Sequence, residues 1–77
     1  MRTIFVRVTD EVDPCYAPVS AASLTSTTFT IEHPHPDYAD VHLEFQAGDN
    51  VRCRATRLRG PDEDEPRQRM VAVERIA

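Results

Sequence analysis

The sequence contains no lysine and no tryptophan, and it has only two glycines and two cysteines. Two glycines cannot build a glycine-rich phosphate-binding loop, because that loop needs several glycines at short spacing. Two cysteines cannot build the disulfide framework that stabilises many small secreted domains. No apolar run approaches the roughly 18 residues of a membrane-spanning helix. These absences argue against a P-loop enzyme, a disulfide scaffold and a helical membrane protein.

The 77 residues are enough for one small domain, spanning residues 1–77, with few strong core formers. The chain has eight Val and three each of Ile, Leu and Phe. A domain of this size buries only about 60% of the surface that its unfolded chain exposes. Small domains with such cores usually depend on a disulfide, a metal or a partner subunit. Because the sequence offers no clear disulfide or metal motif, we expect a homo-oligomer.

The two cysteines and the first residues indicate where the protein works. Residues 1–7 form too short an apolar run for a secretory signal and instead fit a strand. We therefore expect a cytoplasmic protein, in which thiols stay reduced. Cys15 and Cys53 both fall in expected strands, so we expect two buried, unreactive thiols. No cofactor is expected.

Apolar residues alternate with polar ones along most of the chain, which is the period of a half-buried β-strand. Val41, Leu43 and Phe45, for example, share one face of an expected strand. The pattern predicts a mainly β fold, a small barrel or roll of six antiparallel strands. We expect these strands at residues 4–8, 15–24, 28–32, 41–45, 51–59 and 68–76.

Prolines mark the irregular positions of this expected sheet. Pro18 removes a backbone donor inside the second strand, which predicts an edge or a bulge there. Residues 33–37 read His-Pro-His-Pro-Asp, and a residue that precedes proline is pushed towards an extended conformation. We therefore expect a stiff, non-helical connector at residues 33–37, followed by at most one helical turn at residues 37–40.

Motifs in the second half of the chain support this architecture. Phe45 is followed by a Gly48-Asp49 turn, and residues 70–76 read Met-Val-Ala-Val-Glu-Arg-Ile. This order resembles small SH3-like barrels, and it is similar to the plasmid- and cassette-borne type II dihydrofolate reductases. That family binds its ligands in a pore between four subunits, through a Val-Gln-Ile-Tyr strand. Residues 66–70 here read Pro-Arg-Gln-Arg-Met, so no ligand-binding residue carries over from the family.

Over its whole length the chain resembles short uncharacterised bacterial proteins with two motifs. One is aromatic-x-Pro-Val-x-Ala, present here at residues 16–21. The other is Phe-x-x-Gly-Asp-x-Val-x-Cys, present at residues 45–53. This resemblance implies an SH3-like barrel and assigns no activity.

Arginines supply every basic side chain of this acidic protein, whose net charge is −4 and whose pI is about 5.2. Arg52, Arg54, Arg57 and Arg59 lie on one expected strand, with Arg52 and Arg54 on the same face. This stripe, with Tyr16 and Tyr38 available for stacking, is a candidate site for anions or nucleic acid. The alternative is a solvated face on which the acidic residues 62–65 pair with the arginines. An overall acidic charge favours the second interpretation and argues against nucleic acid.

Three histidines are the candidate metal ligands: His33, His35 and His42. Zinc needs three or four convergent ligands, usually in close-spaced pairs. The prolines that follow His33 and His35 hold both in an extended conformation, where neighbouring side chains diverge. We therefore expect no metal site.

The sequence contains no catalytic constellation, and Ser20-Ala21-Ala22-Ser23 matches no nucleophile motif. We therefore expect a non-enzymatic binding or interaction module whose partner is a protein or a small molecule. One alternative is a small-molecule site at a subunit interface, by analogy with the reductases. Another is anion or nucleic-acid binding through the arginine stripe.

The expected assembly can be tested directly. The meagre core and the edges of the expected strands predict a dimer or tetramer. Light scattering at high micromolar concentration should therefore give a mass of at least two chains. A monomer under these conditions would show that the core is sufficient by itself.

Overall fold

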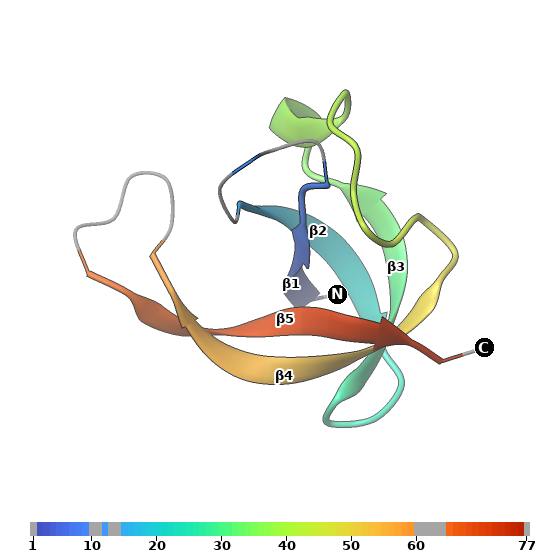
Figure 1. Cartoon of the computed structure of the whole chain (residues 1–77). Coiled ribbons are helices and arrows are strands. Elements are labelled where there is room, and N and C mark those ends of the chain that lie inside the picture. The colour runs from blue at the N-terminus through green and yellow to red at the C-terminus, as the bar shows by residue number, and fades with distance from the viewer. Residues whose placement is uncertain (1, 10–11, 13–14, 60–64, 77) are drawn as a thin grey trace.

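The period-two pattern becomes five strands in the computed structural model, which describes residues 2–9, 12, 15–59 and 65–76. In chain order the elements are the strands β1 (Arg2–Arg7), β2 (Tyr16–Ser23) and β3 (Thr28–Pro34), the 3-10 turn η1 (Pro36–Tyr38), and the strands β4 (Asn50–Leu58) and β5 (Arg67–Arg75). The strands form one sheet in the order β1-β2-β3-β4-β5, which closes as a barrel (Figure 1). Consecutive strands pair antiparallel. The closing contact is parallel, between Phe5 of β1 and Val71 of β5.

The core is filled by alternate residues of these strands, as the period-two pattern predicts. Phe29 of β3 is its largest fully buried side chain. None of the core residues is polar, so none of their side chains requires a buried hydrogen-bond partner. The cluster consists of Ile4, Val6, Val19, Ala21, Phe29, Ile31, Val51, Cys53 and Ala72.

The expected strand at residues 41–45 is wrong, which reduces the count from six strands to five. Leu43 and Phe45 do pack against the core, so the predicted inward face is correct. Only one bridge forms, between Leu43 and Val8, with the Glu44 amide 2.9 Å from the Arg7 carbonyl oxygen. The segment then turns at once, because the Gln46 side chain donates to the Leu43 carbonyl at 3.0 Å.

The expected non-helical connector is partly wrong. Residues 33 and 34 extend β3, but Pro36–Tyr38 forms the 3-10 turn η1. His35 is extended, with φ −60° and ψ 141°, as a residue before proline should be. Its ring nitrogen Nδ1 accepts from the Asp37 amide at 3.1 Å, which caps the turn. Pro36 fits the first helical position because its missing N–H needs no partner there.

Two bulges bend the sheet so that it closes. The β2–β3 register shifts between Ser20 and Ala21, which leaves Glu32 of β3 as the extra residue. The β4–β5 register shifts between Arg52 and Cys53, which leaves Val73 as the extra residue. Bulges increase local twist and often occur where a barrel turns. Pro18, expected near an edge or a bulge, lies two residues before Ser20, after which the first shift occurs.

The second bulge also sets which side chains of β5 face the core. Ala72 lies opposite Cys53 on the inner face, whereas Glu74 lies opposite Arg52 on the outer face. Residues two apart on a regular strand would share one face. The extra residue Val73, which is 43% exposed, allows both placements.

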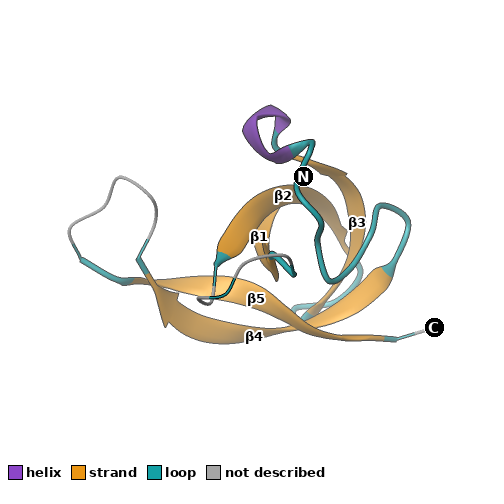
Figure 2. Ribbon diagram, turned by 45° about the horizontal axis from the view of Figure 1, so that its top comes forward, coloured by secondary structure: helices purple, strands orange, loops and turns teal. Residues whose placement is uncertain are grey.

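The outer half of the β4–β5 hairpin extends beyond the other strands, as Figures 1 and 2 show. β3 pairs with β4 only at Asn50–Arg52. β4 and β5 continue to pair with each other as far as Leu58 and Arg67. We call residues 55–58 and 67–70 the hairpin arm. No helix among the described residues has the length and apolar character to span a membrane.

A tight turn at residues 46–49 leads into β4 and requires a glycine. Gly48 has φ +94°, a left-handed conformation that side chains disfavour. The turn is held by the Gln46 amide, which donates to Asp49 Oδ2 at 2.9 Å, and by the Gly48 amide, which donates to the Ile31 carbonyl at 2.8 Å. The turn therefore positions the first residues of β4 against β3.

Gly48→Ala should lower the free energy of unfolding by about 1 kcal/mol. No heavy atom lies within 4 Å of the added Cβ, so the loss comes from the backbone alone. Gly48→Asn is the matched control and should lose less, because asparagine tolerates the left-handed region. Urea unfolding measures both, and an unchanged midpoint for Gly48→Ala would contradict the described turn.

Candidate functional site

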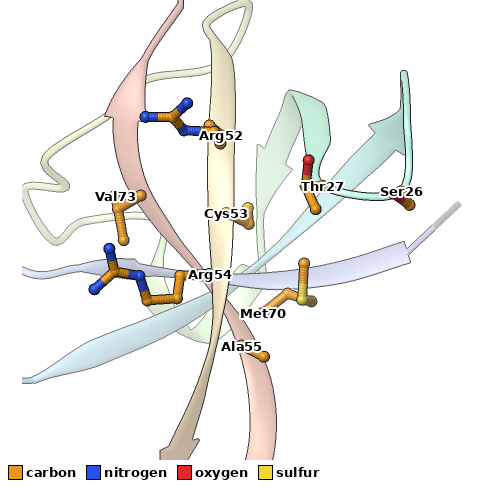
Figure 3. A pocket seen from close by; sticks show the side chains of 8 residues that line it. All are labelled: Ser26, Thr27, Arg52, Cys53, Arg54, Ala55, Met70 and Val73. Carbon is orange, nitrogen blue, oxygen red and sulfur yellow. The ribbon is translucent and has the colours of Figure 1, made fainter.

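An open groove of about 560 Å³ lies between the β2–β3 turn and β4 (Figure 3). This volume falls within the range of small-molecule sites. Two residues come from the turn, four from β4 and two from β5. They are Ser26, Thr27, Arg52, Cys53, Arg54, Ala55, Met70 and Val73.

The β2–β3 turn is shaped by its own threonines. The Thr25 hydroxyl oxygen accepts from the amides of Thr27 and Thr28, at 3.2 Å and 3.1 Å. Threonine commonly forms this type of turn with the backbone that follows it. The Thr27 carbonyl then accepts from the Cys53 amide at 2.7 Å. That bond attaches the turn to β4 and defines one end of the groove.

The floor of the groove is apolar. Cys53 is 5% exposed, and Met70 packs against the same core cluster. Figure 3 shows Thr27, Cys53 and Met70 on one side of the β4 ribbon, and Arg52, Arg54 and Val73 on the other. Burial raises the pKa of the Cys53 thiol to about 11. At neutral pH this thiol is protonated, so it acts as an apolar surface and not as a nucleophile.

The predicted arginine stripe is not one stripe. Arg52 and Arg54 do share the outer face of β4, as expected, but Arg57 is out of step with them and Arg59 follows the end of the strand. Arg52 forms an ion pair with Glu74 of β5. No ion pair joins Arg54, Arg57 or Arg59 to another of the described residues, and all three are exposed. Of the acidic residues 62–65 that we expected to cover the stripe, only Glu65 lies within the described residues.

The two candidate stacking residues are not in the groove. Tyr16 begins β2 and pairs with Arg7 of β1. Tyr38 lies in η1, where its ring contacts the ring of His35 edge-on at 6.1 Å between centroids. The structure brings neither residue to the arginines in the groove lining. A platform that stacks bases beside Arg54 is therefore not part of this site.

The three candidate histidines have separate local roles. The His35 ring caps η1 and lies 3.7 Å from Asp37 Oδ2. The ring of His33 lies 3.3 Å from the Pro34 carbonyl oxygen, and the His42 carbonyl accepts from the Thr9 amide at 2.8 Å. In the part of the chain that the structure describes, no three His, Cys, Asp or Glu side chains gather as a metal site would require.

The expectation of two buried thiols is wrong for one of them. Cys53 is buried in β4, but Cys15 is exposed and precedes β2. Its carbonyl accepts from the Val8 amide at 2.8 Å, so its backbone continues the β1–β2 pairing beyond the strand ends. The period-two pattern assigned Cys15 to the strand, although the alternation that buries Ala17 and Val19 begins after it.

Sequence reasoning identified the arginines of the groove but missed Ser26, Thr27 and Met70. These residues join the site only through the strand register, which the sequence does not reveal. A scan for known protein families and searches of curated proteins and of solved structures found no match. The groove must therefore be interpreted from its own geometry.

The two thiols should differ sharply in reactivity. With Ellman's reagent at pH 8, the native protein should release one equivalent quickly, from exposed Cys15, and the second only after urea is added. Buried Cys53 reacts slowly because its raised pKa keeps it protonated at that pH. Cys15→Ser should remove the fast phase, and a fast phase that persists in this variant would contradict the burial of Cys53.

Proposed function

We propose that this protein is a binding module without catalytic activity, and that its groove beside β4 receives a segment of a partner protein. The observation that carries the proposal is the open groove of about 560 Å³ on an apolar floor, beside a stretch of β4 that β3 leaves unpaired. Peptide-recognition sites commonly combine a strand edge with a pocket for side chains. The hydroxyls of Ser26 and Thr27 and the guanidinium of Arg54 supply the polar rim.

The chemistry of the lining favours binding over catalysis. General acid-base chemistry usually needs a histidine or a carboxylate. None of the described residues that line the groove is of either type. The one thiol in the lining, that of Cys53, has a pKa raised by burial to about 11. These groups can hold a ligand, but they offer no base at neutral pH.

The charge of the site favours a protein segment over nucleic acid. Neutralisation of several phosphates requires a cluster of uncompensated basic residues. In the groove, Arg52 is already paired with Glu74, which leaves Arg54 as the lining arginine without a described carboxylate partner. The whole chain carries a net charge of −4, which opposes a long polyanion more strongly than it opposes a short protein segment with few charges.

Two further expectations remain part of the proposal. An SH3-like arrangement is supported by the closed order of five strands, in which consecutive strands pair antiparallel. Self-association is supported by the small, wholly apolar core of nine residues. Neither is needed for the groove, which is built within one chain.

The proposal is tested by selection of peptides from a random seven-residue display library. Selected peptides, synthesised and titrated into ¹⁵N-labelled protein, should shift the amides of Thr27, Cys53 and Ala55. Thr27→Trp should weaken binding at least tenfold, because the indole fills the groove without a change of charge. Leu24→Trp is the control on the same turn, since Leu24 is 53% exposed and is not in the groove lining. Failure to select any peptide, or equal binding by both variants, would refute the proposed function.

A further inference from the structure

The edge of β4 that faces away from β5 is open along the hairpin arm. Backbone groups of a strand point alternately to its two neighbours. The Asn50 carbonyl accepts from the Ile76 amide on the β5 side, at 2.8 Å, and the Cys53 amide donates to Thr27 on the other side, at 2.7 Å. This alternation directs the amides and carbonyls of Ala55 and Arg57 away from β5. The β3–β4 pairing ends at Arg52, so no described strand pairs with this edge at either residue.

This open edge and the groove are continuous. Ala55 belongs to both, as an exposed residue of the groove lining and as an edge residue of β4. Its methyl group is too small to cover the backbone groups of the edge. The turn residues Ser26 and Thr27 lie where a strand added to this edge would end.

The side chains along the edge select the charge of whatever pairs with it. Arg54 lies on one face of β4, and Arg57 lies on the other. Both are exposed, and neither has an ion-pair partner among the described residues. A strand added beside Ala55 would therefore meet one arginine on each of its faces. Opposite charges on neighbouring strands stabilise the pairing, and like charges oppose it.

The same arginines disfavour a second copy of this chain on the edge. Antiparallel pairing of two such edges around Ala55 would bring Arg54 and Arg57 of both copies into one short stretch. Because Arg54 and Arg57 lie on opposite faces, each face would then hold two like-charged guanidinium groups, one from each copy, without a described carboxylate between them. The occupant that fits is consequently a different segment with acidic side chains.

We propose that the free edge of β4 at Ala55 and Arg57 binds an extended, acidic segment of a partner protein as an added strand. The proposal rests on the proposed function of the groove and deepens it. The segment forms main-chain hydrogen bonds with Ala55 and Arg57. Adjacent carboxylates of the segment, one on each face, pair with Arg54 and Arg57, and an apolar side chain enters the groove above Cys53 and Met70.

The probe for this proposal is the peptide acetyl-Thr-Val-Glu-Glu-Val-Thr-amide, titrated into the full chain by isothermal calorimetry. Its two adjacent glutamates lie on opposite faces of an extended strand. The same peptide with glutamine in both positions should bind about tenfold more weakly, since each exposed ion pair contributes a few-fold. On the protein side, Arg54→Gln combined with Arg57→Gln should give a similar loss. The control is Arg2→Gln combined with Arg7→Gln, which removes the same charge from β1.

The decisive test of strand addition uses two methylated forms of the peptide. One carries N-methyl groups on its first, third and fifth amides, and the other on its second, fourth and sixth. An added strand uses only one alternate set of amides for the edge, so one form should lose at least tenfold and the other should bind nearly unchanged. The amides of Ala55 and Arg57 should also exchange more slowly with solvent when the parent peptide is bound.

The outcomes separate this inference from the proposed function. Equal binding by both methylated forms, or by the glutamine peptide and the parent, would overturn the added acidic strand. Failure of the parent peptide while library-selected peptides still depend on Thr27 would also overturn it and leave the groove standing. Failure of both peptide sources would refute the two proposals together. Tighter binding of a twelve-residue oligothymidylate than of the parent peptide at physiological salt would favour nucleic acid instead.

Discussion

The pairing of β4 with β5 is the interaction on which both the fold and the groove depend. It is the longest pairing of the sheet, running from Val51 opposite Arg75 to Leu58 opposite Arg67. Near the core it supplies Cys53 and Ala72 and presents Val71 to β1, so that the sheet closes. Beyond the core the same two strands form the hairpin arm. The hydrogen bonds between β4 and β5 continue from the barrel into the arm. The register that closes the barrel therefore also fixes the position of the arm.

The bulge at Val73 affects both the barrel core and the outer face of the β4–β5 pairing. It places Ala72 inward and Glu74 outward, opposite Arg52. The resulting ion pair between Arg52 and Glu74 occupies one arginine of the outer face. Exposed ion pairs add little to stability. The effect of this one is instead to leave Arg54 as the arginine of the groove lining that has no described carboxylate partner.

The period-two pattern was sufficient to predict the mainly β fold and most of the core. Ile4, Val6 and Val19 are buried where the alternation placed them. The pattern was wrong at residues 41–45, where side chains pack against the core although the segment is not a strand. Leu43 packs against the core, yet it forms a single bridge with Val8, because local bonds turn the chain on both sides of it. The alternation of apolar and polar residues predicts which side chains are buried. It does not predict how many backbone hydrogen bonds a segment forms.

The candidate site could be predicted only in part, for a related reason. The arginines of β4 were visible in the sequence, and Arg52 and Arg54 do share a face. Arg57 is out of step because it lies three positions after Arg54, and an odd number of positions reverses the face on a strand. Ser26, Thr27 and Met70 lie 28, 27 and 16 residues away from Arg54 in the chain, and only the strand register brings them to the same groove. Sequence reasoning can identify charge on a strand, but it cannot identify which turn lies beside that strand.

The open edge of β4 raises a general question about charged residues on strand edges. Arginine there prevents two identical edges from pairing, which is a common protection against aggregation. The same charge attracts a strand edge of opposite charge. An arginine on an edge therefore does not show by itself whether the edge is protected from self-pairing or binds a partner strand. What distinguishes them is the surrounding surface. A purely protected edge needs no cavity beside it, whereas the edge at Ala55 opens onto a groove of about 560 Å³ with an apolar floor. The groove offers a place for the side chain of an added strand, and this observation is the reason that we propose recognition in addition to protection.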